Sequence, residues 1–264
     1  MRKNNINFAK TSGFITLALG AASLIASILY NSQILAFIGL GLTFWGIILT
    51  YIQTEEYVKG SLLPATCLSA LETLNQIMEE LGYKEKAIYL PPKYLTDPEA
   101  NKAYIPKNKE SKLPTPEQTQ GKENRVFLQN PQGIILTPPG SELTKLFEKT
   151  LETNFTKVDL QYLQLNLPKL LIEDLEIAQN LDVTVENNKV NVTIENSSYQ
   201  SLTKEAAKLS KLYESLGCPL SSAIACALAK ATGKPVTIEK QQIIDENKTL
   251  KIEYLLIEEA KAGQ

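Results

Sequence analysis

The sequence predicts an α+β protein: an N-terminal transmembrane helical hairpin, then one soluble domain with a mostly antiparallel sheet packed by helices. Three observations predict this class. Residues 11–54 contain no Asp, Glu, Lys, Arg or His. Later in the chain, pairs of short segments rich in β-branched and apolar residues flank tight turns, which is typical of β-hairpins. Amphipathic helical segments separate these pairs, an order typical of α+β domains rather than of repeated βαβ units.

The uncharged segment is long enough for two membrane spans. It divides at residues 31–33 into two apolar stretches, residues 13–30 and 34–52. Each is close to the roughly 20 residues that a helix needs to cross the hydrocarbon core of a bilayer. We therefore expect a two-helix hairpin over residues 13–52, because helices satisfy all their backbone hydrogen bonds inside lipid. A cleaved secretory signal is the alternative for the first stretch, but its length and the second apolar run argue against it.

Basic residues predict the orientation of this hairpin. Residues 1–12 contain Arg2, Lys3 and Lys10, and Lys59 follows the second span, whereas the turn between the spans is uncharged. Because basic flanks stay on the cytoplasmic side, we expect a multi-pass protein of the cell membrane with cytoplasmic N- and C-termini. Neither span contains an ionisable residue, which argues against transport by this chain alone.

Small residues recur at helical spacing in both spans. They are Gly20, Ser23 and Ser27 in the first and Gly39, Gly41 and Gly46 in the second. Small side chains let helices approach closely in lipid, where no hydrophobic force drives them together. We favour packing of the two spans against each other, and a face for homo-oligomer formation is the alternative.

Composition restricts the chemistry of the soluble domain, residues 61–264. The 264 residues include no histidine, which removes the commonest general base and metal ligand. The 27 basic and 29 acidic residues nearly balance and form no basic stripe with aromatic residues, so we expect no nucleic-acid binding. Three dispersed cysteines do not suit a disulfide framework or a zinc site, and no glycine-rich phosphate motif occurs. We expect no cofactor and no metal.

The soluble domain is expected to begin with a helix over residues 65–81, where apolar residues repeat at intervals of three and four. A strand over residues 87–90 follows and ends at two prolines. Residues 93–124 are then polar and rich in Pro, Lys and Glu. Such a segment buries little apolar surface, so we expect a long loop or a partly disordered insertion there.

The remaining elements are expected to be hairpins and helices in turn. Turn residues predict β-hairpins over residues 125–137, 181–195 and 236–257. Helical periodicity predicts a helix from Ser141, two short helices over residues 159–179 that break at Pro168, and one helix over residues 199–216. A last helix begins at Pro219 and ends at Gly233, with the proline and glycine placed as helix ends prefer them.

Cys218 is the strongest candidate for chemistry. It directly precedes Pro219 at the predicted start of an Ala- and Ser-rich helix, where the helix dipole favours a thiolate. Such a thiol acts as a nucleophile, a redox sensor or a lipidation site. It has no histidine partner, however, and a cysteine before a proline is also a good helix start, so we favour a structural role. Cys226 is expected in the core.

Other polar groups are expected to be solvated. Glu173, Asp174 and Glu176 cluster on a short helix and would suit a cation or an acid–base pair, but an exposed helix face is the simpler account. Four Asn-x-Ser/Thr triplets would accept glycans only on an outward-facing domain, which the predicted orientation excludes. These triplets begin at Asn154, Asn191, Asn196 and Asn247.

Residues 216–257 carry a family resemblance. They contain a helix led by Gly217-Cys218-Pro219, then the sequence Gly-Lys-Pro-Val and two strands. This arrangement resembles the C-terminal part of uncharacterised archaeal membrane proteins with two N-terminal spans, which implies no reaction and no catalytic residues. It is also similar to the end of the small-molecule-binding domain named after vinyl reductase, although that family's metal-type Cys and His positions are missing here.

These observations predict a membrane-anchored, non-enzymatic binding or assembly protein whose partners are the lipid bilayer and another protein. The alternative is a membrane-tethered small-molecule sensor, or an enzyme that uses Cys218 with carboxylates. A deep polar pocket beside Cys218 would favour the alternative. A broad apolar patch or an open sheet edge would favour the first hypothesis.

Overall fold

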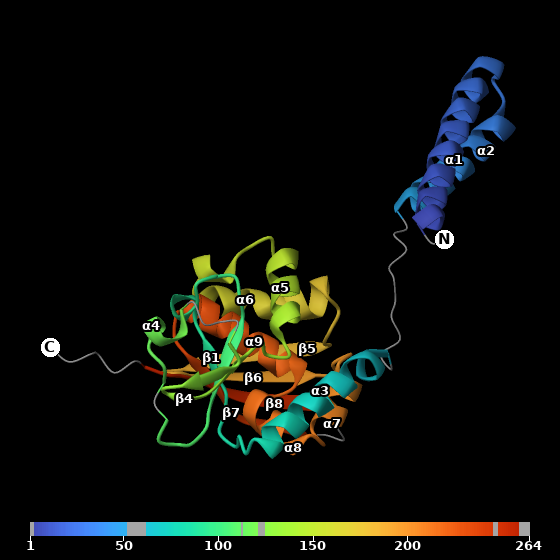
Figure 1. Cartoon of the computed structure of the whole chain (residues 1–264). Coiled ribbons are helices and arrows are strands. Elements are labelled where there is room, and N and C mark those ends of the chain that lie inside the picture. Colours follow the sequence, from blue (N-terminus) through green and yellow to red (C-terminus); the bar gives the residue numbers. More distant parts are fainter. Residues whose placement is uncertain (1–2, 52–61, 112, 121–124, 245–247, 259–264) are drawn as a thin grey trace. The chain divides into compact units, whose positions relative to one another are not determined.

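The computed structural model describes residues 3–51, 62–111, 113–120, 125–244 and 248–258. The chain forms two compact units, Met1–Val58 and Lys59–Gln264. Figure 1 shows the elements of each unit. The N-terminal unit contains helices α1 (Lys3–Tyr30) and α2 (Gln33–Tyr51). Both are long and apolar enough to cross a membrane, and about half of their described side chains are exposed.

The two N-terminal helices pack against each other through their small residues. A Cβ atom added at Gly20 or Gly46 would lie 2.6 Å from a backbone nitrogen of the other helix, and one at Gly39 would lie 2.8 Å from a Leu24 side-chain carbon. The Ser23 hydroxyl donates to a backbone carbonyl of the other helix, 3.1 Å away. This confirms the packing expected from the spacing of the small residues. A Cβ atom added at Gly41, by contrast, would have no atom of the other helix within 4 Å.

The second unit is built on one eight-stranded sheet in which all neighbouring strands are antiparallel. The spatial order is β3-β4-β2-β1-β7-β8-β6-β5. The strands are β1 (Ile88–Leu90), β2 (Lys102–Pro106), β3 (Phe127–Gln129), β4 (Gln132–Leu136), β5 (Asn180–Glu186), β6 (Lys189–Glu195), β7 (Val236–Ile244) and β8 (Thr249–Leu256). The three predicted hairpins, β3–β4, β5–β6 and β7–β8, are confirmed.

The helices of this unit lie mainly on one side of the sheet. They are α3 (Leu62–Glu80), α4 (Pro116–Thr119), α5 (Ser141–Thr150), α6 (Leu160–Lys169), α7 (Gln200–Ala206), α8 (Ser210–Leu216) and α9 (Pro219–Thr232). Three short turns are η1 (Pro92–Tyr94), η2 (Phe155–Lys157) and the π-helical η3 (Leu170–Asp174). The predicted α+β class, with an antiparallel sheet packed by helices, is confirmed.

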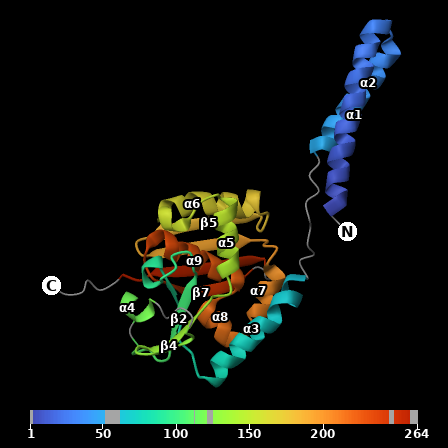
Figure 2. The same ribbon diagram turned by 45° about the horizontal axis from the view of Figure 1, so that its top comes forward.

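Helix α9 is the centre of the core. It contacts β1, β7 and β8 on one side and α5 and α6 on the other (Figure 2). All residues of Pro219–Lys230 are buried. By length and composition, residues 210–232 would also qualify as a membrane span, but most of that stretch is buried inside this unit. Its apolar character therefore serves the core, where water is excluded by neighbouring elements.

Gly140 lets α5 approach α9 closely. A Cβ atom added there would lie 2.1 Å from the backbone nitrogen of Ala223. The Gly140 N–H donates to the Ser222 hydroxyl at 3.0 Å, and the Thr144 hydroxyl donates to the Ala223 carbonyl at 3.0 Å. The Ala and Ser residues of α9 thus leave room for its neighbours, because larger side chains would hold the elements apart.

The expectation that residues 93–124 form a loop or disordered insertion is wrong for the described part of that segment. Strand β2 lies inside the sheet, between β1 and β4. Beside it, a second small core covers the other side of this half of the sheet. Its buried members are Leu90, Tyr94, Leu95, Tyr104, Leu128 and Ile135. The segment has few apolar residues, but those few are concentrated where they bury completely.

Two helix boundaries also differ from the expectation. The single helix expected over residues 199–216 is two helices, α7 and α8, which pack separately against α3. Pro168 does not break α6 as expected: it lies inside this helix, and the chain stays helical directly into η3. A proline has no N–H to donate to the carbonyl four residues before it, and the wider π-helical turn follows this gap in the hydrogen-bond ladder.

Candidate functional site

Cys218 is the N-cap residue of α9. Its backbone is extended, and its carbonyl accepts the first helical hydrogen bond, from the Ser222 N–H at 2.8 Å. Its Sγ accepts a hydrogen bond from the Ser221 N–H at 3.4 Å and lies 3.3 Å from the Ser221 hydroxyl. The side chain is fully buried. The predicted position at the start of the helix is confirmed, and the thiol satisfies a backbone donor there.

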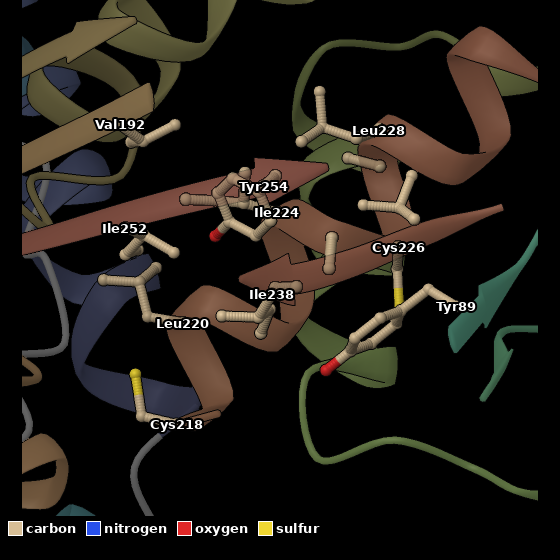
Figure 3. Packing of buried hydrophobic residues seen from close by; sticks show 14 of the residues in the cluster. Tyr89, Val192, Cys218, Leu220, Ile224, Cys226, Leu228, Ile238, Ile252 and Tyr254 are labelled. Carbon is tan, nitrogen blue, oxygen red and sulfur yellow. The ribbon is translucent and has the colours of Figure 1, made fainter. Parts of the chain in front are cut away.

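Two buried tyrosines hold the helix start against the sheet. The Tyr89 hydroxyl of β1 donates to the Leu216 carbonyl at 2.6 Å, and the Tyr254 hydroxyl of β8 donates to the Ser221 carbonyl at 2.9 Å. Burial raises the pKa of both phenols well above the usual value, so both stay protonated donors. Figure 3 shows these tyrosines and Cys218 in the apolar cluster around α9.

This geometry does not suit a nucleophile. A reactive thiol needs access to its substrate and a base or cation beside it. Cys218 has neither accessible surface nor a basic hydrogen-bond partner among the described residues. Cys226 is also buried, and burial raises the pKa of its thiol to about 12. Cys67, on α3, is the exposed cysteine.

The three thiols are therefore expected to differ in reactivity. In the native full-length protein at pH 8, Ellman's reagent should react quickly with Cys67 alone, and with all three thiols after denaturation.

Substitutions of Cys218 test its structural role. The free energy of unfolding of Cys218→Ser should stay within about 1 kcal/mol of the parent, because serine caps helices well. Cys218→Leu should lose at least about 2 kcal/mol, from the lost cap and an overpacked site. Fast labelling of native Cys218 would contradict this assignment.

The carboxylates that the sequence groups together lie on the protein surface. Glu173, Asp174 and Glu176 lie at the end of η3 and just after it, and none of them is buried. In the described part of the chain, no three His, Cys, Asp or Glu side chains are grouped so that they hold a metal ion. Of the glycosylation triplets, the Asn154 side chain caps η2, and Asn247 lies outside the described residues.

The sequence reasoning missed a buried ion pair. The Lys230 ammonium group on α9 lies 2.9 Å from the Glu148 carboxylate of α5 and donates to the Glu99 carbonyl at 3.1 Å. The same carboxylate accepts the Phe155 N–H at 2.9 Å. The Lys230 side chain is only 2% exposed. The pair links α9, α5, η2 and the segment before β2, so its role is to hold these elements together.

Tyr213 contains a buried hydroxyl that has no hydrogen-bond partner among the described residues. Burial raises the pKa of this phenol, because its ionised form would be poorly solvated. The residue is on α8, and it lines a surface hollow beside β7.

Tyr213→Phe should be neutral or stabilising, by up to about 1 kcal/mol, since it removes a buried polar group that gains no bond. Urea unfolding of the two full-length proteins measures the difference. Tyr254→Phe is the matched control, because its hydroxyl does have a partner. Tyr254→Phe should be less stable than the parent. If Tyr213→Phe lowers the free energy of unfolding by as much as Tyr254→Phe, the Tyr213 hydroxyl must form a hydrogen bond.

In half of the sheet, one face is covered by no element that the structure describes. On β5, β6, β8 and the end of β7, side chains alternate between buried and accessible, and the accessible ones are mostly polar. We call these accessible residues the open face. Its members include Asp182, Thr184, Lys189, Asn191, Thr193, Lys240, Gln242, Lys251 and Glu253. A shallow hollow of about 280 Å³ lies on it, and one cross-strand ion pair, Lys189–Glu253 at 2.5 Å, orders part of it.

Comparison with known proteins relates the chain to a family. A family model described as a domain of unknown function, DUF7982, matches residues 7–254. The match begins within α1 and ends within β8, so it includes parts of both units, which belong to a single family pattern. Neither the curated proteins nor the solved structures include one with significant similarity to the chain.

Proposed function

The chain belongs to the DUF7982 family, and we propose that it is a membrane-anchored, non-enzymatic binding protein. In this proposal α1 and α2 cross the bilayer as a hairpin, with both chain ends in the cytoplasm. The second unit then presents the open face to a protein partner. The resemblance of residues 216–257 to two-span archaeal proteins supports this arrangement.

The anchor part of the proposal is supported by the exposed side chains of α1 and α2. Phe37 and Ile28 are 84% and 81% exposed, and the described span residues contain no charge. Exposing so much apolar surface to water would be unfavourable, whereas lipid solvates it. The uncharged turn at Asn31 and Ser32 crosses a bilayer more easily than the basic flanks do.

The binding part is supported chiefly by the open face. It spans four strands, mixes both signs of charge, and includes accessible threonines. Such a surface fits a protein partner better than nucleic acid, which requires an excess of positive charge. The burial of Cys218, the candidate nucleophile, supports binding rather than catalysis.

Topology is tested by thiol labelling of intact cells. A cysteine placed at Ser32 should react with a membrane-impermeant reagent, and Cys67 should not react until the membrane is opened. The buried Cys218 and Cys226 contribute little signal, so no cysteine-free background is needed. Labelling of Cys67 in intact cells would show that the second unit lies outside the cytoplasm and would contradict the proposed orientation.

Binding is tested by site-specific photocrosslinking in cells. A benzophenone amino acid replaces Thr193 or Lys251 on the open face, and Glu173 or Lys149 as matched positions elsewhere on the surface. The proposal expects one discrete adduct from both open-face positions and none from the controls. Thr193→Arg in the Lys251 crosslinking protein should abolish the adduct by adding bulk and charge. Equal adducts from all four positions would contradict a specific surface.

A further inference from the structure

A second hollow, of about 320 Å³, lies beside α8 and strand β7. Its walls come from three separate parts of the chain: the segment before β1, helix α8, and residues 238–241 of β7. The volume is at the lower end of the range for small-molecule sites. It lies on a different part of the surface from most of the open face, with Lys240 at the boundary of both.

A β-bulge builds this hollow. The register between β7 and β8 pairs Ile238 with Tyr254 but Lys240 with Glu253, so Glu239 is an extra residue in β7. Bulges of this kind redirect side chains and occur often beside functional sites. After the bulge, Gln241 faces the helix side of the sheet, opposite buried Ile252 in the register.

The redirected Gln241 is held at both ends of its amide. Its Nε2 donates to the Tyr213 carbonyl at 2.6 Å, and its Oε1 accepts the Ser221 hydroxyl at 2.9 Å. The wall of the hollow is therefore connected to α8 and to the first turn of α9. Hydrogen bonds at both ends keep this wall in one arrangement, which lowers the entropic cost of binding a ligand.

The charges around the hollow leave positive groups available. Lys86 forms an ion pair with Glu239 at 3.6 Å. Lys84 and Lys240 lie within ion-pair distance of no carboxylate in the described part of the chain. The carboxylate opposite Lys240 in the sheet, Glu253, pairs directly with Lys189, and the charge of Lys240 contributes more weakly to lowering its pKa. Glu214 at the rim offsets one of the two, so the lining keeps one excess positive charge.

We propose that this hollow binds a small soluble organic anion, with a carboxylate or phosphate group attached to a compact apolar body. The anionic group would lie between the ammonium groups of Lys84 and Lys240. The apolar body would pack against the partly exposed Tyr213 and the alkyl chains of the lining lysines. This assignment is independent of the open face, because a protein partner and a small ligand would use different residues apart from Lys240.

The test uses the full chain in nanodiscs of phosphatidylcholine, with phenyl phosphate as the probe and calorimetry as the readout. Phenyl phosphate should bind saturably, and both inorganic phosphate and benzyl alcohol should bind at least about tenfold more weakly, because each lacks half of the ligand. The double variant Lys84→Gln/Lys240→Gln should raise the Kd about five- to tenfold, the range expected for two exposed ion pairs.

The matched control is Lys149→Gln/Lys204→Gln, which removes the same charge from positions elsewhere on the surface. Its Kd should stay within about twofold of the parent. An equal loss in the control, or no saturable binding of phenyl phosphate, would overturn the site. Adding phosphatidylglycerol to the nanodiscs should not change the Kd. Competition by that lipid would overturn the assignment to a soluble ligand and point to a lipid headgroup.

Discussion

Replacing residues 93–124 by a short Gly/Ser linker is expected to unfold the second unit. The replacement removes β2, whose loss would separate β4 from β1 and divide the sheet. It also removes Tyr94, Leu95 and Tyr104 from the small core on the other side of that half of the sheet. Circular dichroism should show loss of strand signal, and the thermal transition of the second unit should disappear.

Single substitutions distinguish the contribution of strand β2 to stability from that of exposed residues in the same segment. Tyr104→Ala should cost about 3–5 kcal/mol, the usual range for truncating a large buried aromatic side chain, because Tyr104 is fully buried between β1 and β4. Lys109→Gln and Glu110→Gln, at exposed positions, should leave the thermal transition within about 1–2 °C of the parent. A cooperative transition at the parent temperature after the replacement would show that β2 is dispensable.

Lys230→Met is expected to destabilise the second unit by about 3–5 kcal/mol, because it leaves the Glu148 carboxylate nearly buried without its counter-ion. Glu148→Gln should cost a similar amount by leaving the Lys230 ammonium group unpaired. Urea unfolding of the full-length variants measures both. The double variant should recover most of the loss, since two neutral side chains of similar size replace the pair and the new amide oxygen can still accept the Phe155 N–H.

The cycle of these variants gives the coupling between the two residues. A coupling of at least about 2 kcal/mol is expected, because the partners are in direct contact and shielded from water. The exposed pair Lys145–Glu142 on α5 is the control, and its coupling should stay below about 1 kcal/mol. Additive losses at Lys230 and Glu148 would show that the pair contributes nothing beyond its two separate side chains.

The elements that could be predicted from the sequence are those with local signals. The β5–β6 hairpin has alternating residues on both sides of a two-residue turn, and Asn187 adopts the positive φ that such turns require. The start of α9 at Cys218 likewise follows from Pro219 and a run of small residues. In both cases, neighbouring residues in the sequence contain the whole pattern.

What could not be predicted depends on partners distant in the sequence. Strand β2 contains only a short apolar run around Tyr104, and it forms a strand because it pairs with β1 and β4, which are distant in the sequence. The hollow beside β7 joins three separate segments, and no sequence pattern indicates the bulge at Glu239. The sequence does contain an indication of the ion pair at Lys230. It is the one charged residue in residues 216–233, so if that helix is buried, the ammonium group needs a buried acidic partner.

The strand order has a consequence for how the protein is made. Strands β7 and β8 are the last to be synthesised, yet they join β1 to β6 at the middle of the sheet. Helix α9, which contacts both the sheet and the outer helices, is also synthesised late. The second unit therefore cannot complete its core while most of the chain is emerging from the ribosome, and its earlier strands must wait unpaired on one side.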